Sequence, residues 1–166
     1  MLNIMLAAAL VVTAPAQLRA VDVARPAAPI AETRHTVSDD NEHMLKARKA
    51  LEAGDFDLAR REFVIAAALE RDAGRLPKDA VFGLAHSLYS LSYTREAAMV
   101  MNKLADEASQ AGDTDTEAMA LADALWLNVE AGQRAQARAD GSRLRYLLKT
   151  AKLSAATREY VSTRAR

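Results

Sequence analysis

The sequence has no cysteine among its 166 residues, which excludes a disulfide framework and a lipid anchor attached through cysteine. It has only 6 glycines and 4 prolines, so a collagen-like chain is excluded as well. Runs of β-branched residues are scarce after Val12, and no strand pattern competes with helices. Alanine dominates the apolar residues instead, which favours helices that approach each other closely. A chain of this length forms one domain with a hydrophobic core.

The N-terminal residues differ in composition from the rest of the chain. Leu2 to Val12 are almost wholly apolar, and Ala14-Pro15-Ala16 offers a small-x-small cleavage site before Gln17. This pattern predicts a signal peptide over residues 1–16. A permanent anchor needs roughly 20 apolar residues, so we expect a soluble periplasmic or secreted protein with no transmembrane anchor after processing. Met1–Ile4 supply no Lys or Arg, so a cytoplasmic protein stays the alternative.

Residues 17–37 combine prolines and many alanines without apolar periodicity, which predicts a disordered Ala/Pro linker. The helical domain is predicted over residues 38–166, beginning at the capping pair Ser38-Asp39. Short turns between its helices predict antiparallel packing of neighbours. Seven helices are expected: 38 to about 53, 56 to about 73, Pro77 to about Leu91, Thr94 to Gly112, Thr114 to Gly132, 134 to about 150, and Ser154 to Tyr160 or beyond.

Most of the predicted helices carry a stripe of apolar residues at spacings of three and four, which must face a neighbour. Phe63 is expected to be buried between the helices of its own hairpin and the next. Asp55 and Ser154 are expected to cap the helices that follow them, and Thr114-Asp115-Thr116-Glu117 has the form of a capping box. The stripe residues are Phe56, Ala59, Phe63, Ala66; Val81, Leu84, Ala85, Leu88, Leu91; Ala97, Met101, Leu104, Ala105, Ala108; Ala118, Leu121, Ala122, Leu125, Val129; and Ala137, Leu144, Leu147, Leu148.

The turns between paired helices recur at a regular spacing. Gly54, Ser92 and Gly132 are separated by 38 and 40 residues, and each is followed at the same offset by an alanine, at positions 59, 97 and 137. Such a period predicts a solenoid of stacked hairpins that bury their apolar faces against one another. We therefore expect an all-α fold of about three repeats, closed by a capping helix after Ser154.

The segment Gly54-Asp55-Phe56-Asp57, followed by Ala59, Phe63 and Ala66, resembles the second-helix signature of tetratricopeptide repeats. The resemblance covers Asp40 to about Lys149. The sequence departs from the family because no Trp opens a first helix, because Arg71 stands where a proline usually ends the unit, and because the period exceeds the family's roughly 34 residues. The resemblance implies a concave groove lined by the first helix of each pair, and it implies no chemistry.

A second stripe on the third predicted helix consists of Phe82, His86 and Tyr89, at positions i, i+4 and i+7. The resemblance places these residues in the groove, together with Arg48 from the first repeat and Trp126 from the third. Binding surfaces concentrate aromatic residues and arginine. Two interpretations stay open: the five residues bind a partner, or the rings pack on neighbouring helices and form a wide core.

Charge is distributed unevenly along the chain, although its formal net charge is zero. Residues 133–166 carry a net charge of plus seven, and residues 1–132 carry minus seven. The basic end could dock on an anionic surface or an acidic partner, or it could be an ordinary solvated face. Nucleic acid is not expected as a partner. The basic residues are Arg134, Arg138, Arg143, Arg145, Lys149, Lys152, Arg158, Arg164 and Arg166.

The residues that could carry chemistry are few. His35, His43 and His86 show no metal-ligand spacing, and no HExxH motif, phosphate loop or nucleophile elbow occurs. His43 lies beside Glu42 and close to Asp39-Asp40, which could hold a divalent ion adventitiously or form a solvated helix start. We therefore expect no catalytic residue, no metal and no cofactor.

These observations predict a non-enzymatic scaffold or adaptor of the cell envelope that binds a partner protein or peptide in a concave helical groove. A binding protein for a small apolar ligand is the alternative, with Phe82, Tyr89 and Trp126 enclosing a pocket. An enzyme is a third possibility, and it would need convergent titratable groups.

Overall fold

The computed structural model describes residues 42–164. This part of the chain forms seven α-helices and no strand, which confirms the predicted all-α class. The predicted signal peptide, the linker and the cap at Ser38-Asp39 lie outside the described residues. No helix in the described range combines the length and hydropathy that a membrane span requires. The helices are α1 (Glu42–Glu52), α2 (Phe56–Asp72), α3 (Lys78–Ser90), α4 (Thr94–Ala111), α5 (Thr114–Glu130), α6 (Arg134–Thr150) and α7 (Ala155–Arg164).

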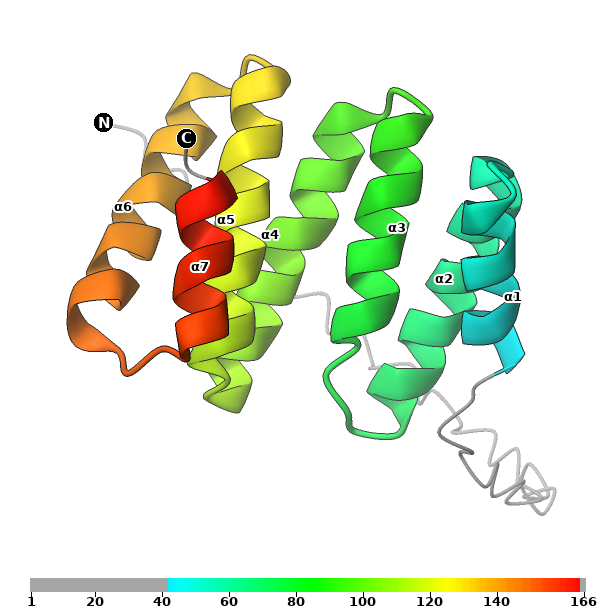
Figure 1. Cartoon of the computed structure of the whole chain (residues 1–166), viewed down its shortest axis with the longest axis horizontal. Coiled ribbons are helices and arrows are strands. Elements are labelled where there is room, and N and C mark those ends of the chain that lie inside the picture. The colour runs from blue at the N-terminus through cyan, green and yellow to red at the C-terminus, as the bar shows by residue number, and fades with distance from the viewer. Residues whose placement is uncertain (1–41, 165–166) are drawn as a thin grey trace, which may run out of the picture. The chain divides into compact units, whose positions relative to one another are not determined.

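The helices form hairpins that stack in chain order, as Figure 1 shows. The hairpins are α1–α2, α3–α4 and α5–α6, and they join through contacts of α2 with α3 and of α4 with α5. The first helix α1 also packs on α3, and α7 packs on α5. The fold is therefore a short helical-repeat solenoid in which α7 covers α5 at the end of the stack.

The turns inside the three hairpins share one backbone geometry. Gly54, Ser92 and Gly132 all adopt a left-handed conformation, with φ of 76°, 65° and 71°. In each turn the amide of the next residue donates to a carbonyl five residues earlier, as in a Schellman motif. These bonds run from Asp55 to Ala50, from Tyr93 to Leu88 and from Gln133 to Asn128, with N···O distances of 2.9, 2.8 and 2.7 Å. The turns between hairpins, at Gly74 and Gly112, have the same geometry, with φ of 70° and 73°. Ser92 is the one described residue other than glycine in this conformation, which favours glycine.

Most of the predicted stripe residues lie in the core, including all five of α4. Val129 is the clear exception, because its side chain is 59% exposed. Asn128 takes the inward position in the last turn of α5 and donates from its side-chain amide to buried Asp140 on α6, at 2.7 Å. A polar pair therefore closes the α5–α6 interface where apolar contact was expected.

At the α2–α3 interface, the ring of Phe63 packs against Gly83. Phe63 is 1% exposed, which confirms its predicted burial. Its ring lies directly against Gly83 of α3, where an added Cβ would be only 2.3 Å from Phe63 Cζ. Glycine at this position therefore permits a contact that any larger residue would prevent.

The helix starts confirm two expected caps and correct one. Asp55 accepts the Leu58 amide at 3.0 Å, and Ser154 accepts the Thr157 amide at 3.1 Å. The predicted capping box at residues 114–117 is wrong, because Asp113 caps α5 and accepts the Thr116 amide at 3.0 Å and the Thr116 hydroxyl at 2.7 Å. Burial would raise the pKa of Asp113, but these hydrogen bonds outweigh it and hold that pKa below its usual value.

Arg71 joins two hairpins. Its Nε and Nη2 donate to the two carboxylate oxygens of Glu107 on α4, at 2.9 and 3.1 Å. Such a bidentate pair fixes the two helices relative to each other more closely than a single charge contact does. Arg71 therefore has a structural role between α2 and α4.

Candidate functional site

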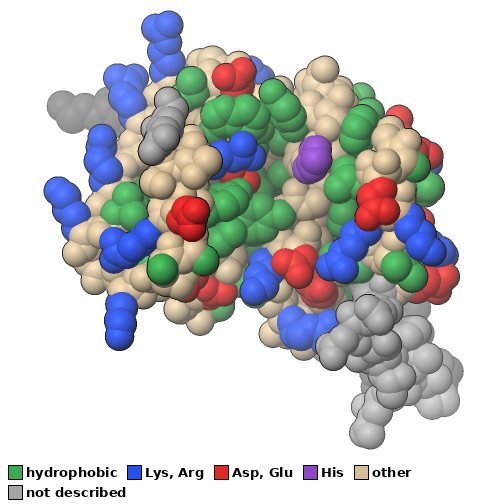
Figure 2. All heavy atoms as spheres, viewed as in Figure 1, with side chains coloured by type: hydrophobic (Ala, Val, Ile, Leu, Met, Phe, Trp, Pro, Cys, Tyr) green, Lys and Arg blue, Asp and Glu red, His purple; other side chains and the backbone are tan. Residues whose placement is uncertain are grey.

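A cavity of about 360 Å³ lies between α3, α5 and α7. Four aromatic side chains line it, from three helices that are distant in sequence. Figure 2 shows hydrophobic side chains gathered between the parts of this face that α7 and α3 occupy. The lining residues are Phe82, Ala85, His86 and Tyr89 of α3, Asp123, Trp126 and Leu127 of α5, and Tyr160 and Arg164 of α7.

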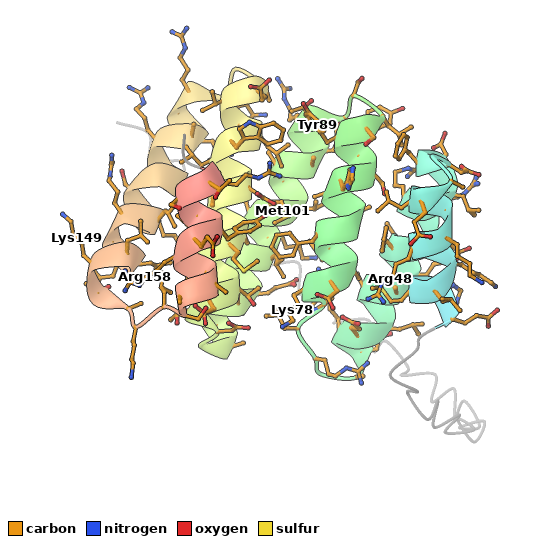
Figure 3. All side chains as sticks on the ribbon, viewed as in Figure 1. Arg48, Lys78, Tyr89, Met101, Lys149 and Arg158 are labelled. Atoms are coloured by element: carbon orange, nitrogen blue, oxygen red, sulfur yellow. The ribbon has the colours of Figure 1, made fainter. Side chains whose placement is uncertain are left out.

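Four of the five predicted site residues line this cavity. Phe82, His86 and Tyr89 reach it together because their spacing places them on one face of α3. Trp126 faces them from α5. Arg48 is exposed on α1 and is not part of the cavity wall. Figure 3 shows Arg48 on the opposite side of α3 from α7, so the proposed five-residue site divides into a cluster of four and one separate arginine.

Ring contacts hold the aromatic wall in place. Tyr89 and Trp126 lie with their ring centroids 4.9 Å apart and tilted by 56°, joining α3 to α5. Phe82 meets Tyr160 edge to face at 6.5 Å, joining α3 to α7. Such pairs are favourable beyond the area they bury. Tyr89 is nevertheless 40% exposed and Trp126 only half-buried, so the wall is ordered and still open to solvent.

The polar side of the cavity centres on a buried carboxylate. Asp123 accepts the Tyr160 hydroxyl at 2.8 Å and Arg164 Nε at 2.6 Å. The guanidinium of Arg164 also lies over the Trp126 ring, 4.8 Å from its centroid. This distance is within the range of a cation–π interaction. Asp123, Tyr160, Arg164 and Trp126 therefore form one connected cluster that ties the end of α7 to α5.

The protonation states in this cluster follow from its contacts. Burial raises the pKa of Tyr160 well above its usual value, and the charge of Asp123 and its hydrogen bond raise it further. Burial would lower the pKa of Arg164, but its hydrogen bond and ion pair with Asp123 outweigh this and raise it. Tyr160 is therefore a neutral donor and Arg164 a cation at neutral pH.

Sequence patterns did not predict three of these residues. Asp123 is an acidic residue within the apolar run from Ala118 to Leu127, and this interruption was the available signal. Tyr160 and Arg164 belong to the helix that was expected only to cap the stack. Their bonds to Asp123 span 37 and 41 residues, so no local pattern predicts them.

The basic C-terminal part of the chain is only partly neutralised. Arg143 binds Glu117 and Asp106, and Arg164 binds Asp123. The other basic residues of this part that the structure describes are exposed, and none of them forms an ion pair within residues 42–164. Figure 3 shows two of them, Lys149 and Arg158, at the α6–α7 end of the stack.

The remaining histidine is engaged within the fold. His43 Nδ1 lies 2.6 Å from Glu62 Oε2, which joins α1 to α2. The aspartates considered with it, Asp39 and Asp40, lie outside the described residues. Among residues 42–164, no group of three or more His, Asp or Glu side chains is placed to hold a metal ion. Comparison of the chain with protein-family models, with curated proteins and with solved structures finds no match.

Proposed function

We propose that this protein is a non-enzymatic scaffold of the tetratricopeptide type that binds a segment of a partner protein in the cavity between α3, α5 and α7. The observation that carries the proposal is the Tyr89–Trp126 pair, whose rings meet at 4.9 Å on the open wall of the cavity. Partly exposed aromatic residues held by their neighbours are typical of the positions that dominate binding energy. Because the rings are already ordered, binding costs little conformational entropy.

The size of the cavity favours a peptide side chain over a small molecule. Small-molecule sites enclose roughly 300–1,000 Å³, and this cavity of about 360 Å³ is at the lower end. It accommodates one or two side chains of a longer segment that continues along the surface. A small apolar ligand is the second candidate, favoured by the aromatic residues on three sides of the cavity.

The arrangement of charged groups supports binding rather than catalysis. Asp123 and Arg164 are bound to each other, and Tyr160 donates to the same carboxylate. A general acid or base needs a proton position directed at a substrate, whereas these groups direct their hydrogen bonds within the protein. We therefore propose no catalytic residue.

Placement in the cell envelope is part of the proposal and depends on Leu2 to Val12 and the Ala14-Pro15-Ala16 site. N-terminal sequencing of the native protein tests it. We expect a mature chain that begins at Gln17 or, with cleavage after Ala20, at Val21. Intact Met1 on protein recovered from the cytosol would contradict export.

The partner proposal is tested by capture from an envelope extract, followed by affinity measurements on the captured partner. Trp126→Ala should weaken binding by about 2 kcal/mol or more, since truncation of a central aromatic residue has this effect at protein interfaces. Tyr146→Ala is the matched control, because Tyr146 is an exposed aromatic residue on α6 outside the cavity. Equal affinity of the two variants for the partner would refute the proposed site.

A further inference from the structure

The aromatic cavity already contains a cation, and the protein supplies it. Arg164 bonds to Asp123 at 2.6 Å and lies over Trp126 at 4.8 Å. The Asp123 side chain is only 9% exposed. A buried carboxylate is costly unless a cation pairs with it, and the face of an indole ring attracts cations as well. The surroundings of the guanidinium are therefore those of a recognition site for a positively charged group.

Arg164 is held less firmly than the comparable arginine of the fold. Arg143 donates to Glu117, to Asp106 and to the Ala105 carbonyl, so acceptors from α4 and α5 enclose its guanidinium. Within residues 42–164, Arg164 has one carboxylate partner, Asp123, and its side chain is 43% exposed. It also belongs to the last turn of α7, and helix ends open at low free-energy cost.

The helix that carries Arg164 is itself weakly embedded. Of its ten residues, only Thr157 and Val161 are buried. Its start is tied down separately, because the Ser154 amide donates to Asp115 at 2.9 Å. The end of α7 is therefore held mainly by the bonds of Tyr160 and Arg164 to Asp123, whereas its start is held by a separate bond.

We propose that Asp123 and Trp126, with the Tyr160 hydroxyl, form a site for an arginine side chain of the partner segment, and that Arg164 occupies this site until the partner displaces it. This inference rests on the proposed function of the cavity and specifies the chemistry of its ligand. An anionic ligand is disfavoured, because a group bound to Arg164 would lie close to the buried Asp123 carboxylate. Arginine fits better than lysine, since its planar guanidinium stacks on a ring while it bonds to a carboxylate.

The test uses N-acetyl-arginine methylamide as the probe, titrated into the full chain by calorimetry with Trp126 emission as a second readout. Arg164→Ala should bind the probe about ten-fold more tightly than the unmodified chain, because it removes the internal competitor. Adding Asp123→Asn to that variant should abolish the gain. The citrulline analogue, which is neutral and nearly the same shape, should not bind. If the variant with Asp123→Asn does not fold, Trp126→Leu in the Arg164→Ala background replaces it as the test. This variant keeps the carboxylate and loses the indole ring, and it should bind the probe more weakly than Arg164→Ala does.

Three results would overturn the inference. The first is equal probe affinity of the Arg164→Ala variant and the unmodified chain, and the second is equal binding of the citrulline analogue. The third is binding of N-acetyl-leucine, through its carboxylate, by the unmodified chain and not by Arg164→Ala, which would identify an anion site.

The captured partner separates this inference from the proposed function. In one outcome, the partner no longer binds to Trp126→Ala, yet it binds equally well to Arg164→Ala with and without Asp123→Asn. This outcome would leave the cavity function intact and refute the cation site. Binding of the probe by Arg164→Ala, together with a partner indifferent to Trp126→Ala, would support the cation site and refute the proposed function.

Discussion

Two faces of helix α3 differ in how they are filled. Toward α2 the helix presents Gly83, and the Phe63 ring packs directly on the backbone, so this interface is closed. Toward α5 it presents Tyr89 and toward α7 it presents Phe82, and a cavity of about 360 Å³ remains between the three helices. The absence of a side chain at Gly83 allows close approach, whereas the rings of Phe82 and Tyr89 line an open cavity. One helix thus provides both a packed core and an open site.

The largest effect is expected from removing the ring that closes the α2–α3 interface. Phe63→Ala should lower the free energy of unfolding by about 3–5 kcal/mol, because it leaves a cavity where a fully buried ring was packed. Urea denaturation measures this loss. A decrease below about 1 kcal/mol would mean that the interface is not closed by Phe63.

A methyl group added on the other side of that contact should also destabilise the fold. Gly83→Ala places a Cβ 2.3 Å from Phe63 Cζ, and we expect a loss of about 3 kcal/mol, at the upper end of overpacking effects. In a double-mutant cycle, Phe63→Ala should relieve most of this loss, because the ring that clashes is gone.

Gly141→Ala on α6 is the matched control for the glycine substitution. Its Cβ would meet Leu125 at an ordinary 3.7 Å, so we expect a stabilisation of up to about 1 kcal/mol from helix propensity. A similar stabilisation at Gly83 would show that the close contact is absent in solution.

A smaller loss of stability than for Phe63→Ala or Gly83→Ala is expected in the wall of the cavity. Trp126→Ala should cost about 1–2 kcal/mol, below the value for a fully buried ring, since the indole is half-buried. Thermal melts measure this, and partial quenching of its fluorescence by iodide provides an independent check because Trp126 is the only tryptophan. A loss as large as that of Phe63→Ala, with emission that iodide does not quench, would make Trp126 a core residue.

The elements that local sequence predicted well are those that depend on neighbouring residues. The turns at Gly54, Ser92 and Gly132 each separate two helices, as the sequence predicted. The apolar stripe of α4 is buried throughout, because a helical period is a property of the segment alone. The predicted burial of Val129 is wrong, because Asn128 takes the inward position and bonds to Asp140, which belongs to α6.

The residues of the candidate site can be separated in the same way, into those that the sequence predicted and those that it did not. Helical spacing was enough to place Phe82, His86 and Tyr89 on one face. The resemblance grouped Trp126 with them, but it grouped Arg48 with them as well. Only the tertiary structure brought in Asp123, Tyr160 and Arg164 and separated Arg48 from the cluster. The reason is that the periodicity of a helix decides which of its residues share a face. The packing of α7 on α5 decides which charged residue from another helix contacts that face.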